Sequence, residues 1–366
     1  MKRLILALVV TIGLCYLLLR VVDVPFAEVR DEVTARMQNL RLLPLLGAFL
    51  IYASTYVARG FRLGLLLPGR QRLVHLTAVA ARHNLLNLVL PMRSGEASLP
   101  WMLRREAGVP WAQGAAALVL ARVLDMTGLA FWACVGLAWY GLGSGPGEQV
   151  QSAARGVLLT LVLGLLVMRP VASWAAGRLT GRASWIGFVR NVAELVAGLS
   201  PGRLAGALFV SLLTWCATYA VYWLLIGTLA DPGGDAIAQE LAGVDFARSL
   251  VGTTGLHMTS VLPVNTVGGA GVWEGAWVAG YTLLAGLEQN AALISGIVAH
   301  LCNLVFLAVL GALGYALRGT GRAQRLQSVE TSARSSTEGD ADLMLSARSV
   351  AAPRLSATAE SSSRSS

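Results

Sequence analysis

Long apolar segments, separated by short stretches that carry arginine, follow one another from residue 4 to residue 317. Lipid offers the backbone no hydrogen-bond partners, so segments of this kind cross a membrane as α-helices, which satisfy their own polar groups. The composition agrees, because apolar residues make up 55% of the chain and charged residues only 13%, whereas a soluble domain carries about 25% charged residues. The sequence therefore predicts an all-α, polytopic integral membrane protein.

The lengths of the apolar segments predict about six full spans and two broken, re-entrant hairpins, or about six to ten membrane segments. The full spans are expected at residues 4–19, 42–58, 111–140, 157–168, 204–230 and 291–317. The first resembles a signal peptide, but residues 20–23 contain no small-residue cleavage site, so we expect it to be retained. Residues 24–41 predict either an amphipathic helix on the membrane surface or a short helix packed on other spans.

Arginine-rich loops indicate which ends of the spans face the cytoplasm, because Lys and Arg accumulate on that side. Segments 59–72 and 169–203 are rich in arginine and are expected inside, whereas the acidic loop 231–245 is expected outside. This topology places both termini in the cytoplasm, and we expect a bacterial inner membrane. The loop 20–41 is an exception, because it would lie outside although it also holds several arginines.

Two parts of the chain differ in composition. Residues 1–320 form the predicted membrane domain, and residues 321–366 are rich in Ser, Ala and Arg without a sustained period, which predicts a disordered cytoplasmic tail. The chain contains no Gly-x-x-x-x-Gly-Lys-Ser/Thr loop, no His-Glu-x-x-His and no Gly-x-Ser-x-Gly motif. We therefore expect no enzymatic activity and no cofactor. Neither the cysteines nor the histidines have metal-ligand spacing, so no metal site is predicted.

The net charge of +9 comes almost wholly from arginine, since Lys2 is the single lysine. These arginines are scattered among apolar segments, which argues against nucleic-acid binding. Arginine presents a planar fork of donors that suits phosphate. The charge therefore fits a phosphate-bearing partner within or beside the membrane.

One apolar run ends within the membrane domain at Asn87-Leu-Val-Leu-Pro-Met-Arg-Ser-Gly-Glu96. Arg93 and Glu96 flank Gly95 there, which predicts either a simple turn with a capping glutamate or a buried ion pair that offers Arg93 to an anionic headgroup. Asn87 shares a helix face with other polar residues, which line a site or lie at headgroup level.

A second stretch, far downstream, has the same character: a Leu-Pro break at 262–263, the glycines Gly268, Gly269 and Gly271, and then Glu274. The glycines permit close approach of a ligand to the backbone, and the following helix could bind phosphate at its N-terminus. Glu274 near that terminus is favourable in any helix because of the dipole. Broken apolar segments at corresponding places in two halves are typical of a transporter's binding site and suggest an inverted repeat.

Arg122 and Asp125 lie in the middle of the long apolar segment 111–140, where a charged side chain costs roughly 2.5–3.5 kcal/mol. Their spacing of three places them on one helix face. One interpretation is an ion pair that holds helices together. The other is that Arg122 lines a polar cleft and Asp125 fixes its direction.

Three motifs resemble the flippase-like membrane domain of lysylphosphatidylglycerol synthases and its stand-alone relatives, including hopanoid-cluster membrane proteins. Leu90-Pro-Met-Arg-Ser-Gly-Glu96 is similar to the family's Leu-Pro-x-Arg-x-Gly-Glu, and Ala121-Arg-Val-Leu-Asp125 to its Glu-Arg-x-x-Asp. Pro263-Val-Asn-Thr-Val-Gly-Gly-Ala-Gly-Val-Trp-Glu274 is similar to its Pro-x-x-Gly-Gly-x-Gly-x-x-Glu. Two positions depart from the pattern, since Leu99 stands where Arg is frequent and Ala121 where the family has Glu.

The resemblance implies movement of a lipid with an anionic or phosphate-bearing headgroup between membrane leaflets. It implies binding residues at Arg93, Glu96, Arg122 and Asp125 together with the second glycine stretch. The alternative is a non-catalytic membrane subunit or scaffold for a lipid-modifying or polyprenyl-glycosyl transferase. Either way the expected partners are a membrane lipid and an enzyme of lipid biosynthesis.

Overall fold

The computed structural model describes residues 2–69, 71–140, 147–179, 184–258 and 266–317, and every regular element within those ranges is helical. The predicted tail 321–366 lies outside them and stays a prediction. Five described helices are long and apolar enough to cross a membrane: α3 (Leu42–Leu66), α6 (Trp111–Tyr140), α7 (Gly147–Arg178), α9 (Pro201–Gly227) and the helix Gln289–Leu317.

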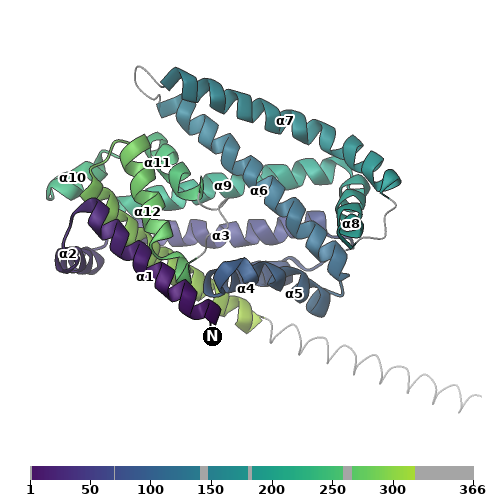
Figure 1. The fold of residues 1–366 in the computed structure, drawn as a ribbon, viewed down its shortest axis with the longest axis horizontal. Coiled ribbons are helices and arrows are strands. Elements are labelled where there is room, and N and C mark those ends of the chain that lie inside the picture. The colour runs from purple at the N-terminus through teal and green to yellow at the C-terminus, as the bar shows by residue number, and fades with distance from the viewer. Residues whose placement is uncertain (1, 70, 141–146, 180–183, 259–265, 318–366) are drawn as a thin grey trace, which may run out of the picture. The chain divides into compact units, whose positions relative to one another are not determined.

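A sixth candidate span is the bent pair of α1 (Lys2–Val22) and α2 (Phe26–Gln38), which meet at an angle of 93° and qualify only when they are taken together. Figure 1 shows α2 turning away from the end of α1. One face of α2 is anchored, since Val29 is buried and Arg36 forms ion pairs with Glu32 and with Asp235 just before α10 (Ala236–Ala242). The predicted all-α, polytopic fold with about six spans is therefore confirmed.

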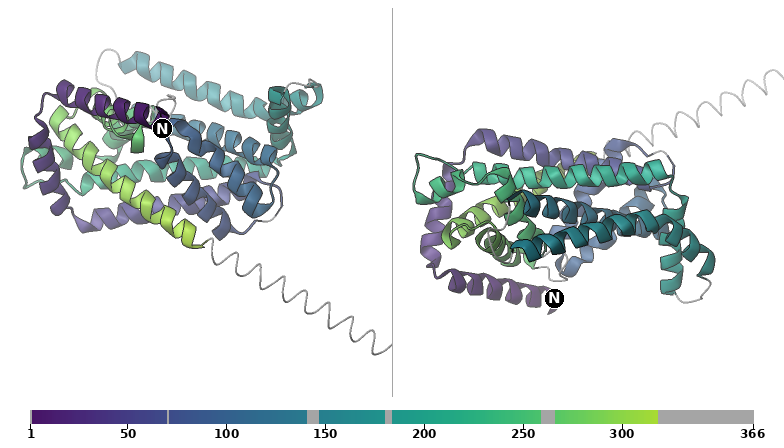
Figure 2. Two further views of the ribbon diagram at one scale, coloured as in Figure 1. Left: turned by 60° about the horizontal axis from the view of Figure 1, so that its bottom comes forward. Right: turned by 90° about the horizontal axis from the view of Figure 1, so that it is seen from above.

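The helices α3 and α9 pack on each other along their length and lie side by side at one edge of the bundle when it is seen from above (Figure 2, right). They run antiparallel: Arg203 near the start of α9 donates to the carbonyls of Gly64 and Leu67 at the end of α3. Arg41, just before α3, donates its N–H to the carbonyl of Thr228 just after α9. The C-terminal end of α3 therefore marks one end of the bundle and the C-terminal end of α9 the other.

The first predicted hairpin consists of α4 (Leu73–Val89), a 3₁₀ turn (Pro91–Ala97) and α5 (Ser98–Ala107). With 17 residues, α4 is roughly 25 Å long and falls short of a 30 Å hydrocarbon core. The two helices pack on each other, so the chain returns to the end from which it came. Gly108 ends α5 with φ +68°, a conformation that glycine adopts without steric cost.

The second predicted hairpin consists of α11 (Phe246–Met258) and α12 (Val272–Ala279), the latter continued by a π-helical turn (Gly280–Leu284). A short 3₁₀ turn (Val267–Gly269) precedes α12. The predicted Leu-Pro break at 262–263 lies outside the described residues. Both helices are shorter than a full crossing, and they pack against each other.

The two hairpins enter from opposite ends of the bundle. α4 follows the C-terminal end of α3, whereas α11 follows the C-terminal end of α9, and α3 and α9 are antiparallel. α4 of the first hairpin packs on the turn Val267–Gly269, which precedes α12 of the second. Internal symmetry between the hairpins, the predicted inverted repeat, stays a prediction.

The segment 59–72 was expected to form a cytoplasmic loop, but its first half is helical and belongs to α3. α3 continues to Leu66 and carries Arg59 and Arg62 inside the bundle, because Arg62 finds a buried carboxylate partner there. The helix ends at Pro68-Gly69, where Gly69 has φ +78°. Similarly, α8 (Ser184–Gly198) lies within the loop expected at 169–203.

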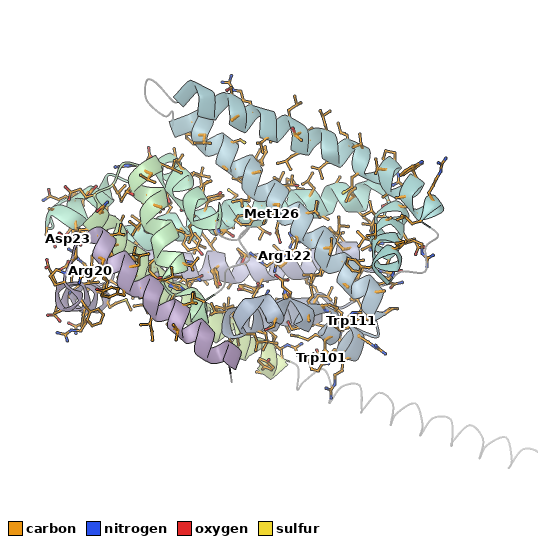
Figure 3. The ribbon with its side chains drawn as sticks, in the orientation of Figure 1. Arg20, Asp23, Trp101, Trp111, Arg122 and Met126 are labelled. Carbon is orange, nitrogen blue, oxygen red and sulfur yellow. The ribbon has the colours of Figure 1, made fainter. Side chains whose placement is uncertain are left out.

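Figure 3 marks the two ends of the bundle by labelled side chains. Arg20 and Asp23 lie at the turn between α1 and α2, and Trp101 and Trp111 lie at the opposite end. The tryptophans are more than 40% exposed, and exposed Trp is enriched where a membrane meets water. Arg122 lies between these ends, in the middle of α6.

Candidate functional site

The best-buried ion pair of the candidate site joins α3 to α6. Arg62 donates from Nη1 to Oδ1 of Asp125 at 2.5 Å and from Nη2 to Oδ2 at 3.0 Å, and both side chains are about 95% buried. Nη1 also donates to Oγ of Ser211 in α9, at 2.7 Å. This bidentate pairing satisfies the carboxylate and fixes the relative position of three helices.

A second ion pair joins the tip of the first hairpin to α6. Arg122 donates from Nη2 to Oε1 of Glu96 at 2.6 Å, and its side chain is 41% exposed. Gly95 lies directly against Asn87 in α4, since a Cβ at this glycine would lie 2.6 Å from the Asn87 Cα. The tight turn thus aims the Glu96 side chain at Arg122.

Polar side chains of α4 continue the site toward the hairpin tip. Asn87 donates from Nδ2 to Nε2 of His83 at 3.3 Å, which leaves Nδ1–H of His83 to donate to Oγ of Ser98 at 2.8 Å. Arg82 points elsewhere and forms a bidentate ion pair with Glu106 in α5 at 2.6 and 2.8 Å. That pair connects the two helices of the hairpin and does not line the pocket described next.

These groups surround a pocket between α3, α4, α5 and α6. Its polar lining consists of Arg59, Arg62, His83, Asn84, Arg122 and Asp125, and its apolar lining of Leu63, Ala80, Leu99, Leu118 and Ala121. The two positions that depart from the family pattern, Leu99 and Ala121, thus lie in the same pocket. Relative to the family pattern, the lining of this pocket therefore lacks one arginine and one glutamate. The two losses cancel, so the net charge of the lining is the same as in that pattern.

The ion pairs differ from the predicted ones. Asp125 was expected to hold Arg122, but it binds Arg62, and Glu96, which was expected beside Arg93, binds Arg122. Arg93 belongs to the 3₁₀ turn, and its side chain is outside the described part of the structure. The i,i+3 spacing places Arg122 and Asp125 on one face of α6, as expected, but partners from other elements separate them.

A second cluster surrounds His300 of the helix Gln289–Leu317. Its Nδ1 lies 2.5 Å from Oε1 of Glu274, and its Nε2 lies 3.0 Å from the carbonyl oxygen of Gly268. Glu274 also accepts the N–H of Gly271 through Oε2 at 2.7 Å, and thereby caps α12. The ring of Trp273 stacks on the imidazole with centroids 4.5 Å apart.

The glycines of this second cluster allow close packing of the turn. Gly271 has φ +82°, and a Cβ there would lie 2.9 Å from the Leu14 Cβ of α1. Gly268 and Gly269 also have positive φ, and Gly269 lies beside His300. None of the four predicted residues in this stretch, the three glycines and Glu274, lines the arginine pocket.

His300 is thus a buried histidine whose two ring nitrogens both have partners, Glu274 and the Gly268 carbonyl. Arg59 and Arg62 were missed as pocket residues. One signal was present in the sequence: no Pro interrupts the chain between Arg59 and Pro68. Across the described ranges, no three His, Cys, Asp or Glu side chains gather as metal ligands would.

Comparison with known proteins agrees with this architecture. The chain is 28% identical over 297 residues to a Haloferax volcanii protein named Glycosyltransferase AglD; the match covers 69% of this chain and 45% of that protein. The chain therefore spans less than half the length of this relative. Residues 4–311 match the family described as the lysylphosphatidylglycerol synthase TM region. Since that match covers most of the chain, the protein belongs to this family of membrane domains.

Proposed function

We propose that this protein moves a lipid with a phosphate-bearing headgroup between the two leaflets of a bacterial inner membrane, with both termini in the cytoplasm. One observation carries the proposal: two short helical hairpins enter from opposite ends and meet where α4 packs on the turn Val267–Gly269, and α4 also lines a pocket with three arginines. Non-helical backbone at membrane depth is tolerated where it is buried in protein or lines a polar cavity.

In this proposal the headgroup enters the arginine pocket while the acyl chains stay in lipid. Arg122 is the more accessible of the two paired arginines in the pocket, and Glu96 orients its guanidinium. The Arg62–Asp125 pair holds the pocket wall together at its buried end. A planar guanidinium suits a phosphate through two parallel hydrogen bonds. Because the sequence contains no ATP-binding loop, transport would run down a lipid gradient or be coupled to an ion gradient.

The experiment is leaflet exchange in proteoliposomes that contain fluorescent phospholipids and are quenched from outside. The purified protein should increase the quenched fraction beyond the outer-leaflet share. Arg122→Gln should lower the initial rate about tenfold or more, because a charge-assisted hydrogen bond contributes roughly 1.5–3 kcal/mol. Arg104→Gln is the matched control, since Arg104 is exposed on α5 and does not line the pocket.

Quenching equal to that of empty liposomes, across anionic and zwitterionic headgroups, would contradict the proposal. Equal rates for Arg122→Gln and the wild type would retain transport but remove Arg122 from the path. Both comparisons require that the wild type and the variant are incorporated in equal amounts, measured on the same vesicles.

A second candidate function is a non-catalytic membrane subunit or scaffold for a lipid-modifying or polyprenyl-glycosyl transferase. It is favoured by the name of the Haloferax relative and by the more than half of that protein that this match does not cover. This candidate predicts no leaflet exchange by the purified protein. It also predicts that Arg122→Gln still restores glycolipid or modified-lipid synthesis in cells that lack the gene, whereas the first candidate predicts a loss.

A further inference from the structure

Arg59 differs from the other arginines of the pocket because no carboxylate pairs with it. Asp125 is engaged by Arg62, and Glu96 by Arg122. Among the described residues, Arg59 forms no ion pair and no hydrogen bond, and its Nε is buried without a partner. Its guanidinium lies over the ring of Tyr56, with 5.9 Å between the guanidinium carbon and the ring centroid.

The position of Arg59 makes this lack of a counter-charge costly. It lies seven residues before the end of α3, which is roughly 10 Å into the bundle from that end. A charged side chain within a membrane helix is expensive, and it usually faces a cavity and has a partner. Residues 259–265, which follow α11 in the sequence, include no acidic residue that could supply one.

The charges of the pocket define what the missing partner must be. Among the described side chains, three guanidinium groups face two carboxylates, since Glu96 reaches Arg122 from the hairpin tip, so this set carries one net positive charge. A ligand with one negative charge would neutralise it. A ligand with two would place its second charge close to Asp125 and Glu96, and like charges at short range repel.

We propose that Arg59 binds the ligand's phosphate directly and that the pocket selects a singly charged phosphodiester over a doubly charged phosphomonoester. Arg62 and Arg122 act beside it as cations whose positions are set by their carboxylates. The inference rests on the proposed function in so far as the phosphodiester belongs to a lipid. A soluble phosphodiester shares the chemistry, and the experiment separates the two sources.

The test measures binding to the purified full-length protein in non-ionic detergent, by the rise in its melting temperature with ligand concentration. Dihexanoyl phosphatidylmethanol carries a phosphodiester and short acyl chains, dimethyl phosphate carries the same group without chains, and dihexanoyl phosphatidic acid at pH 8.5 carries two charges. The wild type should bind phosphatidylmethanol more tightly than phosphatidic acid. Arg59→Gln should weaken phosphatidylmethanol binding about tenfold or more.

Two further variants separate loss of binding from loss of structure. Arg104→Gln, an exposed arginine outside the pocket, should bind like the wild type. Arg59→Lys keeps the charge but not the planar fork, and should bind between the wild type and Arg59→Gln. Each variant must elute and melt as the unliganded wild type does; if Arg59→Gln does not, Arg59→Lys decides the result.

The proposal is overturned if folded Arg59→Gln binds phosphatidylmethanol within twofold of the wild type, or if phosphatidic acid binds more tightly than phosphatidylmethanol. Dimethyl phosphate that binds as tightly as phosphatidylmethanol would support the Arg59 site but assign it to a soluble ligand. Lipid exchange that persists in Arg59→Gln would overturn the site and leave the proposed function standing. If the wild type binds phosphatidylmethanol through Arg59 but exchanges no lipid, the Arg59 site stands and the proposed function is overturned.

Discussion

The Arg62–Asp125 ion pair shows why individual charges persist inside this membrane domain. Removal of either charge from water costs several kcal/mol, which the bidentate geometry and the added bond to Ser211 offset. Loss of one partner alone leaves an uncompensated charge, whereas loss of both leaves a cavity among apolar neighbours. The pair therefore sets the positions of α3, α6 and α9 and has a different role from the unpaired Arg59.

We predict that Arg62→Gln lowers stability by about 3–5 kcal/mol, because it leaves the Asp125 carboxylate buried and unpaired. The double variant Arg62→Met/Asp125→Leu should recover much of this loss, since neither charge remains. The fraction of monodisperse protein after heating in detergent measures both, with Arg104→Gln as the control. A double variant as unstable as Arg62→Gln alone would mean that the pair stabilises by more than mutual neutralisation.

The helical elements were largely predictable from the sequence, but their contacts were not. Apolar length predicted the spans, and the Leu-Pro and Gly-rich breaks predicted two short hairpins. Spacing places Arg122 and Asp125 on one face of α6, yet it carries no information about the helix packed there. The actual partners, Glu96 and Arg62, are 26 and 63 residues away in the chain. The contact between His300 and Glu274 could not be predicted for the same reason, because it forms only when α12 packs on the last helix.

Close packing within the second hairpin depends on glycine at particular positions. A Cβ at Gly280 would lie 2.2 Å from the carbonyl oxygen of Gly252 and 3.0 Å from the Cα of Gly255. Small residues of this kind allow helix backbones to approach closely in a membrane. Gly275, five residues earlier in α12, has no atom within 4 Å of the corresponding position.

We therefore predict opposite effects for two alanine substitutions in one short segment. Gly280→Ala should lower the melting temperature, because α11 or the π-helical turn must move to admit the methyl group. Gly275→Ala should leave it unchanged or raise it slightly, since alanine is favoured over glycine in a helix by about 0.5–1 kcal/mol. Equal effects of the two substitutions would show that α11 and α12 do not pack as closely as the structure has them.

At the scale of the whole membrane domain, one hairpin enters from each end of the bundle. Each is too short to cross, and each returns to its own end. Contact of α4 with the turn Val267–Gly269 joins the first hairpin to the second. A polar path between leaflets can then be built from two halves, neither of which exposes its backbone to lipid.

This arrangement predicts which residues are accessible from each side of the membrane. The end that carries Arg104 should face the cytoplasm, because arginine-rich segments gather there, and the end that carries Gly233 should face outward. Both residues are exposed.

After the four cysteines are replaced by alanine, a single cysteine at position 233 should react with a membrane-impermeant maleimide in intact cells. A cysteine at position 104 should react only after the cells are permeabilised. If both reacted from the same side, the hairpins could not enter from opposite leaflets, and the two-sided path would be excluded. Exchanged accessibility would keep that path but invert the protein in the membrane.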